Sequence, residues 1–211
     1  MNIPEYARYD YCYRRSYDFL RKYEIKSYPI DPLWIIHKEK YGLITYSELM
    51  SMHHCSLEDV KKCLSNDGYT TLEFVDGKEV YSIAYNDQSE SAERIRFTLM
   101  HELGHIYLRH LTNFENTQVS HTAISSAEYN VLEREANAFA RNVLAPTSLI
   151  MHMKNRQPKD ISATFGLSIQ AAEARLDFLE LDIDHFDHLG LKKEMQELLQ
   201  NCDTSAIIAG T

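Results

Sequence analysis

Residues 95–110 have the sequence IRFTLMHELGHIYLRH, and this stretch decides the fold. Apolar side chains recur on nearly every side of the helix that it predicts, which is typical of a helix buried in a protein core. His101 and His105 lie four residues apart, so a helix places them on the same face, one turn apart. Because buried imidazole rings need partners, we expect these two histidines to bind a shared group rather than to face solvent.

The spacing of His101 and His105 is the one with which two imidazoles bind a zinc ion. Glu102 lies beside them and is the expected catalytic base, since zinc makes a nearby water more acidic and a carboxylate can accept its proton. Gly104 leaves room for a metal on this face, which would explain a glycine that costs about 1 kcal/mol inside a helix. In a chain with ten histidines the motif can also arise by chance on a solvated helix, but the apolar flanks disfavour that interpretation.

A zinc site that catalyses hydrolysis usually has three protein ligands, so a third ligand is expected elsewhere in the chain. Residues 133–140, EREANAFA, offer two glutamates on a predicted helix. Glu133 shares a face with small residues that would let this helix approach the first one, whereas Glu135 points to the opposite side. We therefore favour Glu133 as the ligand and expect Glu135 to be a surface charge. Asn137 follows Glu133 by one turn and could hydrogen-bond a ligating histidine.

The order of the remaining elements predicts an α+β fold. Asp76 and Gly77 separate two apolar runs, which is a strong hairpin signal, so a small antiparallel or mixed sheet precedes the helix at 92–111. Ser125 or Ser126 is expected to begin a second long helix. Other expected elements are a tyrosine-rich helix within 4–24, a helix at 32–41, a strand at 43–46, a helix after residue 56, a loop at 112–124 and helices over 147–200.

Composition and charge limit the class of protein. The chain has 211 residues, of which 31 are acidic and 22 are basic, giving a formal net charge of −9. This acidity disfavours a general nucleic-acid binder and a protein that rests on an anionic membrane, because both need a basic face. No apolar run is long enough to span a membrane, the N-terminal stretch lacks a secretory leader, and the four cysteines are scattered. We therefore expect reduced thiols and a cytoplasmic protein.

Two segments resemble the signatures of a known family. Residues 95–110 and residues 133–146, EREANAFARNVLAP, are similar to the patterns R-F-T-x-x-H-E-x-G-H and E-x-E-A-N-x-F-A-x-x-L-x-x-P of the ImmA/IrrE metallopeptidases. Residues 161–179 also resemble the segment that often follows in that family. The similarity spans roughly residues 70–180. Ala145 stands where the family often has methionine, a departure expected to affect packing only.

This resemblance implies a zincin-like α+β fold with a gluzincin-like zinc site. His101, His105 and Glu133 are then the metal ligands, and Glu102 is the catalytic residue. It further implies an endopeptidase that cleaves a helix-turn-helix repressor and thereby derepresses genes of a mobile genetic element or a stress response. The alternative is a non-proteolytic regulator that binds a repressor or DNA through its C-terminal helices. The expected layout is a peptidase domain at 1–150 that includes the tyrosine-rich helix, a helical extension at 151–200 and a flexible tail at 201–211.

Other candidate residues stay open. The tetrahedral intermediate of hydrolysis could be stabilised by zinc itself or by a nearby side chain. The candidates for that role are His110, His121, Tyr107 and Tyr129. A second metal site is disfavoured, because the spacing of its possible ligands matches no structural zinc pattern. Those residues are His53, His54, Cys55 and Cys63.

Residues 161–179 also have the pattern of a helix-turn-helix, with a turn at Gly166. Between residues 157 and 180, however, two basic side chains stand against four acidic ones, whereas a DNA-recognition helix should be basic. Packing within the protein, or docking of a protein substrate, is therefore the favoured role for this segment.

Overall fold

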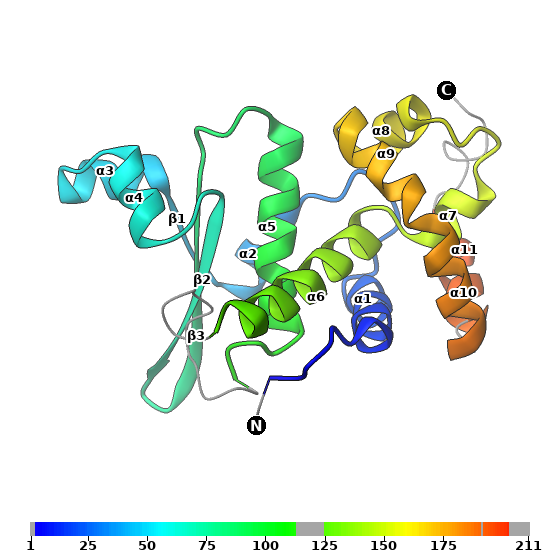
Figure 1. Cartoon of the computed structure of the whole chain (residues 1–211), viewed down its shortest axis with the longest axis horizontal. Helices are drawn as coiled ribbons and strands as arrows, with labels where there is room; N and C mark the ends of the chain where they lie inside the picture. The colour runs from blue at the N-terminus through cyan, green and yellow to red at the C-terminus, as the bar shows by residue number, and fades with distance from the viewer. Residues whose placement is uncertain (1–2, 113–124, 191, 203–211) are drawn as a thin grey trace. The chain divides into compact units, whose positions relative to one another are not determined.

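The computed structural model describes residues 3–112, 125–190 and 192–202. It has the predicted α+β class, with one small mixed sheet and many helices (Figure 1). The predicted loop at 112–124 and the predicted tail at 201–211 fall almost entirely outside the described residues. No helix among the described residues is long and apolar enough to cross a membrane. The four cysteines are free thiols.

The described residues divide into two compact units. One unit holds the residues up to Arg8 together with Asp31–Asn137, and the other holds Tyr9–Ile30 together with the residues from Ala138 onward. The predicted domain boundary at residue 150 stays a prediction. The contacts between residues divide the chain after Asn137 instead. They group the tyrosine-rich helix with the C-terminal helices rather than with the sheet.

The first unit contains the sheet and the helix of the H-E-x-x-H motif. Its elements are α2 (Pro32–Glu39), β1 (Gly42–Thr45), α3 (Tyr46–His53), α4 (Leu57–Cys63), β2 (Gly68–Val75), β3 (Lys78–Tyr85), α5 (Ala92–Tyr107) and the start of α6 (Ser126–Leu144). The strand order is β1-β3-β2, with β2 antiparallel to β3 and β1 parallel to β3. The hairpin turn is the predicted one: Asp76 and Gly77 both have positive φ angles, of 51° and 75°, as a tight two-residue hairpin turn requires.

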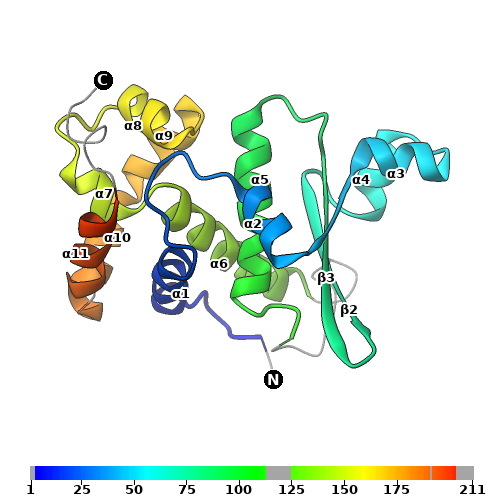
Figure 2. The same ribbon diagram turned by 180° about the vertical axis from the view of Figure 1, so that it is seen from behind.

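Helix α5 forms the centre of this unit. Ser91 caps it by accepting a hydrogen bond from the backbone N–H of Arg94. Its apolar side chains pack against β2, β3 and α2, and α5 lies alongside the sheet in both views (Figure 1, Figure 2). The fully buried residues of this core include Ile35, Ile36, Ile83, Leu99, Met100 and Leu103. The predicted burial of the helix is therefore confirmed, and the sheet and α2 provide it.

Helix α3 is an element that the sequence analysis did not predict. Thr45 and Glu48 form a complete capping box at its start, with each side chain hydrogen-bonded to the other residue's backbone N–H. Tyr46, at the first position of the helix, is fully buried beside Val60 of α4 and Ala84 of β3. Helices α3 and α4 therefore cover their own small apolar cluster.

The second unit is helical. Its elements are α1 (Tyr9–Lys22), the end of α6, α7 (Thr147–His152), α8 (Pro158–Phe165), α9 (Ile169–Asp177), α10 (Leu179–Leu189) and α11 (Lys192–Asn201). Gly166 ends α8 in the left-handed conformation, and Ser168 caps α9, so the predicted helix–turn–helix geometry is present. The tyrosine-rich helix is α1, and its side chains Tyr13 and Tyr17 are buried.

A cluster of buried charges joins the helices of the second unit, and we call it the paired cluster: Tyr13, Arg141, Thr147, Arg175 and Asp182. Arg175 donates to Asp182 at 2.7 Å, to the Thr147 hydroxyl at 2.7 Å and to the carbonyl oxygen of Ala145 at 2.9 Å. Asp182 also accepts hydrogen bonds from the Tyr13 hydroxyl and from Arg141. Arg175 and Asp182 are each 1% exposed, and each finds its partners within the unit.

Candidate metal centre

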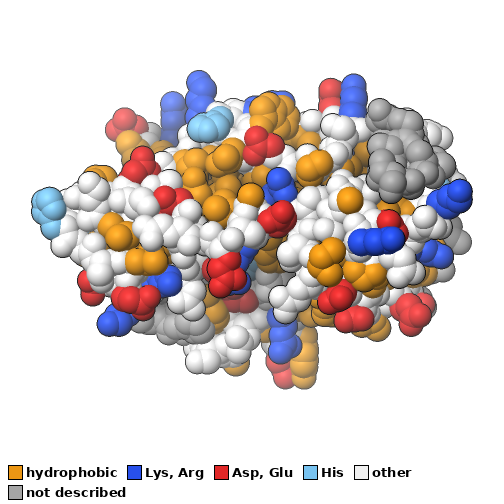
Figure 3. Space-filling model, turned by 90° about the horizontal axis from the view of Figure 1, so that it is seen from above, with side chains coloured by type: hydrophobic (Ala, Val, Ile, Leu, Met, Phe, Trp, Pro, Cys, Tyr) orange, Lys and Arg blue, Asp and Glu red, His pale blue; other side chains and the backbone are white. Residues whose placement is uncertain are grey.

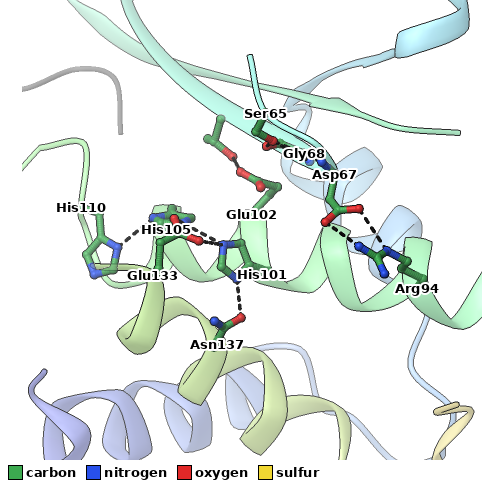
Figure 4. A network of polar contacts seen from close by, with 11 residues as sticks. Ser65, Asp67, Gly68, Arg94, His101, Glu102, His105, His110, Glu133 and Asn137 are labelled. Carbon is green, nitrogen blue, oxygen red and sulfur yellow. Dashed lines mark hydrogen bonds and ion pairs between the residues drawn. The ribbon is translucent and has the colours of Figure 1, made fainter. Parts of the chain in front are cut away.

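Helices α5 and α6 bring two imidazoles and a carboxylate together, and we call His101, His105 and Glu133 the histidine–glutamate cluster. The two Nε2 atoms lie 3.0 Å apart. The Glu133 oxygens lie 3.2 Å from His101 Nε2 and 3.3 Å from His105 Nε2. Figure 4 shows the three side chains converging from the two helices. Among the described residues, these form the group of histidine and carboxylate side chains whose spacing could hold a metal ion.

The spacing fits a tetrahedral ion. Zinc binds imidazole nitrogen and carboxylate oxygen at about 2.0–2.2 Å, so its tetrahedral ligands lie about 3.3 Å from one another. The separations of 3.0, 3.2 and 3.3 Å match this value within a few tenths of an ångström. The donors are the nitrogen and oxygen types that zinc prefers, and three protein ligands would leave a fourth position for water or substrate.

The short distances within the cluster shift the pKa values of His101 and Glu133. Burial by itself would lower the pKa of His101, but hydrogen bonding to Glu133 and the charges of Glu133 and Glu102 raise the pKa to about 9. Burial would likewise raise the pKa of Glu133, but hydrogen bonds and charge from His101 and His105 hold it well below its usual range. A cation is therefore favourable at this position, and a metal ion would take the place of the proton on His101.

Glu102 lies next to the cluster and is held against the sheet. Its side chain is 5% exposed, and its Oε2 accepts a hydrogen bond of 2.5 Å from the Thr70 hydroxyl on β2. A Cβ atom added at Gly68 would lie 2.8 Å from Glu102 Oε1 and 2.7 Å from a methyl of Thr98. Only a glycine at position 68 therefore leaves room for the carboxylate between β2 and α5.

Further contacts orient this part of α5. Asn137 Oδ1 lies 2.9 Å from His101 Nδ1, the ring nitrogen that faces away from the cluster. Arg94, in the first turn of α5, makes two hydrogen bonds of 3.0 and 2.9 Å to Asp67, which precedes β2. The start of the helix and the start of the strand are thus tied together beside the cleft (Figure 4).

The cluster opens into a cleft of about 540 Å³. Its walls include His101, Glu102, His105 and Glu133, together with the first residues of β2. Of the candidates for stabilising the tetrahedral intermediate, Tyr129 lines this cleft. Tyr107 and His110 are buried and are not among the lining residues, and His121 lies outside the described residues.

Glu135 is not the surface charge that we expected. It is fully buried, and the guanidinium of Arg8 donates hydrogen bonds of 2.9 and 2.7 Å to its two oxygens. His110 Nε2 lies 3.0 Å from its Oε2, and His110 Nδ1 lies 2.9 Å from His105 Nδ1. The expectation was wrong because the face of α6 opposite Glu133 is covered by the N-terminal segment and by the turn that follows α5, which a helix pattern does not reveal.

The side chains around Glu135 and His110 shift the pKa values of these two buried groups. Burial raises the pKa of Glu135, but hydrogen bonds from Arg8 and His110 more than offset it and lower the value to about 2. Burial lowers the pKa of His110 to about 4, and the hydrogen bond to Glu135 only partly opposes this. Glu135 is therefore an anion paired with the Arg8 cation, and His110 is neutral at physiological pH.

Comparison with known proteins agrees with this geometry. The family model for the IrrE N-terminal-like domain, a peptidase family, matches residues 59–177, which is more than half of the chain and includes α5 and α6. A search of curated proteins found no match. The small mixed sheet beside α5 and the helical remainder are consistent with the zincin-like fold of this family. The chain belongs to the metal-dependent peptidases of the IrrE N-terminal-like family.

Proposed function

We propose that the chain is a zinc-dependent endopeptidase in which His101, His105 and Glu133 bind the metal and Glu102 is the catalytic base. The observation that carries this proposal is the convergence of three ligand atoms at 3.0–3.3 Å from one another, directly beside a buried carboxylate in an open cleft. Histidines and a glutamate that served only as a structural cluster would not need that neighbouring carboxylate.

Glu102 performs the proton transfers in this proposal. A zinc ion bound at the cluster would supply Lewis acidity, which lowers the pKa of water and polarises a carbonyl group. The Glu102 carboxylate accepts a proton from the attacking water and later donates it to the leaving amine. The Thr70 hydroxyl donates a hydrogen bond to Oε2 of that carboxylate. The other oxygen, Oε1, lies in the narrow space beside Gly68, which limits how far the carboxylate can move.

Of the four candidates named from the sequence, Tyr129 is the one that we propose stabilises the developing oxyanion. It lines the cleft beside Glu133. Burial raises its pKa, and the charge of Glu133 raises it further, so the phenol stays protonated and can donate a hydrogen bond. The Tyr129 hydroxyl would donate this hydrogen bond to the substrate oxygen on which negative charge develops.

The substrate strand would lie along β2. This strand is at the edge of the described sheet, and its residues Gly68–Thr70 line the cleft. An extended peptide can add to such an edge through backbone hydrogen bonds, which accept any sequence and hold the chain straight past the catalytic groups. A protein substrate bound in mid-chain is therefore compatible with an endopeptidase.

The proposed substrate is a helix-turn-helix repressor whose cleavage derepresses genes of a mobile element or a stress response. The ImmA/IrrE-like signatures on α5 and α6 support this substrate class. A cytoplasmic location suits both such a repressor and a chain whose cysteines are free thiols. Direct DNA binding is not favoured, because the formal net charge of the chain is −9. On the face drawn in Figure 3, basic side chains are interspersed with acidic ones.

The test is incubation of the full chain with the repressor encoded beside its own gene, read by intact mass. We expect two fragments with zinc and none with a chelator. The Glu102→Gln chain should keep its zinc and its melting temperature but lose about 10²- to 10⁴-fold in rate, the usual contribution of a general base. Full activity in that variant would refute the role of Glu102. An intact repressor that binds tightly to the wild-type chain would favour the non-proteolytic alternative instead.

A further inference from the structure

A line of buried polar contacts runs from His105 away from the cleft, and we call it the relay: His105, His110, Glu135 and Arg8. Each contact is between 2.7 and 3.0 Å: His105 to His110, His110 to Glu135, and Glu135 to Arg8. The imidazole of His110 and the carboxylate of Glu135 are both 0% exposed. His105 is 4% exposed and meets the cleft only at the other side of its ring.

The relay has one consistent arrangement of protons. Glu135 is ionised against Arg8, and a carboxylate only accepts hydrogen bonds, so His110 must carry its proton on Nε2. Arg8 already balances the charge of Glu135, and a second cation is unfavourable at the fully buried ring of His110, so we infer that His110 Nδ1 accepts a hydrogen bond. His105 must then carry its proton on Nδ1 and donate it to His110. The lone pair on His105 Nε2 is left facing the other two ligands.

We propose that Glu135, His110 and Arg8 are positioning residues that fix the tautomer and ring orientation of His105 for metal binding. This inference rests on the proposed metal site. Ligating histidines usually donate their second N–H to a carboxylate, a carbonyl oxygen or water, and this contact orients the ring. His101 has such a partner in the single residue Asn137. The partner of His105 is a second imidazole, His110, which in turn contacts the buried ion pair of Glu135 and Arg8.

The direction of the relay depends on Glu135 being unable to donate. Glutamine has the same shape, but its amide can donate to His110 as well as accept from it. In a Glu135→Gln chain His110 can reverse its tautomer, which places the His105 proton on Nε2, where the metal would bind. We expect the zinc affinity of this variant to fall about 10- to 100-fold.

The experiment measures the zinc affinity of the full chain by competition with a chelating dye, for the wild type and for Glu135→Gln. Glu128→Gln is the matched control, because Glu128 is a partly exposed carboxylate on the same helix and contacts Ser125 instead of the relay. Melting curves in the presence of a chelator show whether each variant is folded. The control should bind zinc like the wild type.

A second measurement does not depend on any variant folding. With ¹⁵N-labelled histidine, long-range proton–nitrogen spectra of the metal-free wild-type chain report which ring nitrogen carries the proton. We expect His105 to be protonated on Nδ1 and His110 on Nε2. A merely structural role for Glu135 would fix neither tautomer.

The outcomes separate this inference from the proposed function. If the wild-type chain binds no zinc, both fail. If it binds zinc and the folded Glu135→Gln chain binds it equally well, the inference fails and the proposed function stands. A His105 proton on Nε2 in the wild-type spectra also overturns the inference. A loss of affinity in Glu135→Gln together with the expected tautomers supports it.

Discussion

The histidine–glutamate cluster and the paired cluster are both buried groups of charged side chains, but they are completed in different ways. In the paired cluster, Arg175 donates to a carboxylate, a hydroxyl and a carbonyl oxygen, so cation and anion neutralise each other within the protein. In the histidine–glutamate cluster, two imidazole nitrogens and a carboxylate point at one another across 3.0–3.3 Å. These atoms are all electron-pair donors, and they need a proton or a metal ion between them.

This is the difference expected between a structural group of buried charges and the proposed metal site. A buried ion pair is completed by its own partners, and its contribution can be tested through stability alone. A cluster of like donors that faces a cleft is completed only by a cation from outside. Substitutions in one cluster should therefore leave the other unchanged.

The largest expected effect is on folding, when the paired cluster is broken. Asp182→Asn leaves the buried Arg175 guanidinium without its counter-charge, which should lower the free energy of unfolding by about 3–5 kcal/mol. Asp184→Asn, an exposed residue of the same helix, is the control. Urea unfolding followed by circular dichroism measures both. Zinc affinity of the folded Asp182→Asn chain should be unchanged; a coupled loss of zinc would contradict the separation of the two clusters.

The next effect is on metal binding, when a proposed ligand is removed. Glu133→Ala should weaken zinc binding by more than about 100-fold, because an outer partner of a ligand contributes about 10- to 100-fold and a direct ligand contributes more. Glu135→Ala should have the smaller effect, since Glu135 reaches the site only through His110. Equilibrium dialysis with zinc compares the two. Equal losses would reject the choice of Glu133 over Glu135.

Acidity should act on the histidine–glutamate cluster through His101. In the metal-free chain this ring carries a proton below its pKa of about 9, and zinc must displace that proton. Apparent zinc affinity should therefore rise with pH and fall about tenfold for each pH unit lost between about pH 9 and pH 7. Competition titrations at several pH values measure the slope. A zinc affinity that does not change over this pH range would show that the metal does not displace a proton from His101.

The smallest effect concerns the support of Glu102. Thr70→Val keeps the shape of the side chain but removes the hydroxyl that donates to the carboxylate. Peptide hydrolysis should fall about tenfold, as for loss of one hydrogen bond to a charged group, while zinc affinity is retained. Thr71→Val is the control, because Thr71 lies on the other face of β2. Equal rates for the two variants would mean that Thr70 does not position Glu102.

Local patterns in the sequence were enough for much of this architecture. The hairpin at Asp76 and Gly77 and the helix after residue 56 are short-range features, and each is present as predicted. The helical phase of residues 133–140 placed Glu133 on the side of α6 that faces His101 and His105. These features depend on residues within a few positions of one another, which is the range that turn and helix rules describe.

Long-range contacts were not available from those patterns. Arg8 and Glu135 are 127 positions apart, and nothing near Arg8 in sequence marks it as a partner of α6. Helix α3 was missed for a different reason, because Thr45, the first residue of its capping box, lies within the strand that we predicted at 43–46. The relay could have been suspected only from its parts: a second glutamate in the E-x-E-A-N signature and a third histidine after the H-E-x-x-H motif.

The position of Arg8 has a practical consequence for anyone who trims this protein. The family model begins at residue 59, so a fragment cut to that match would keep every motif residue. It would also lose β1, α2 and the guanidinium that balances Glu135. Such a fragment would contain an uncompensated anion behind His105, and a failure to load zinc would then say nothing about the ligands themselves.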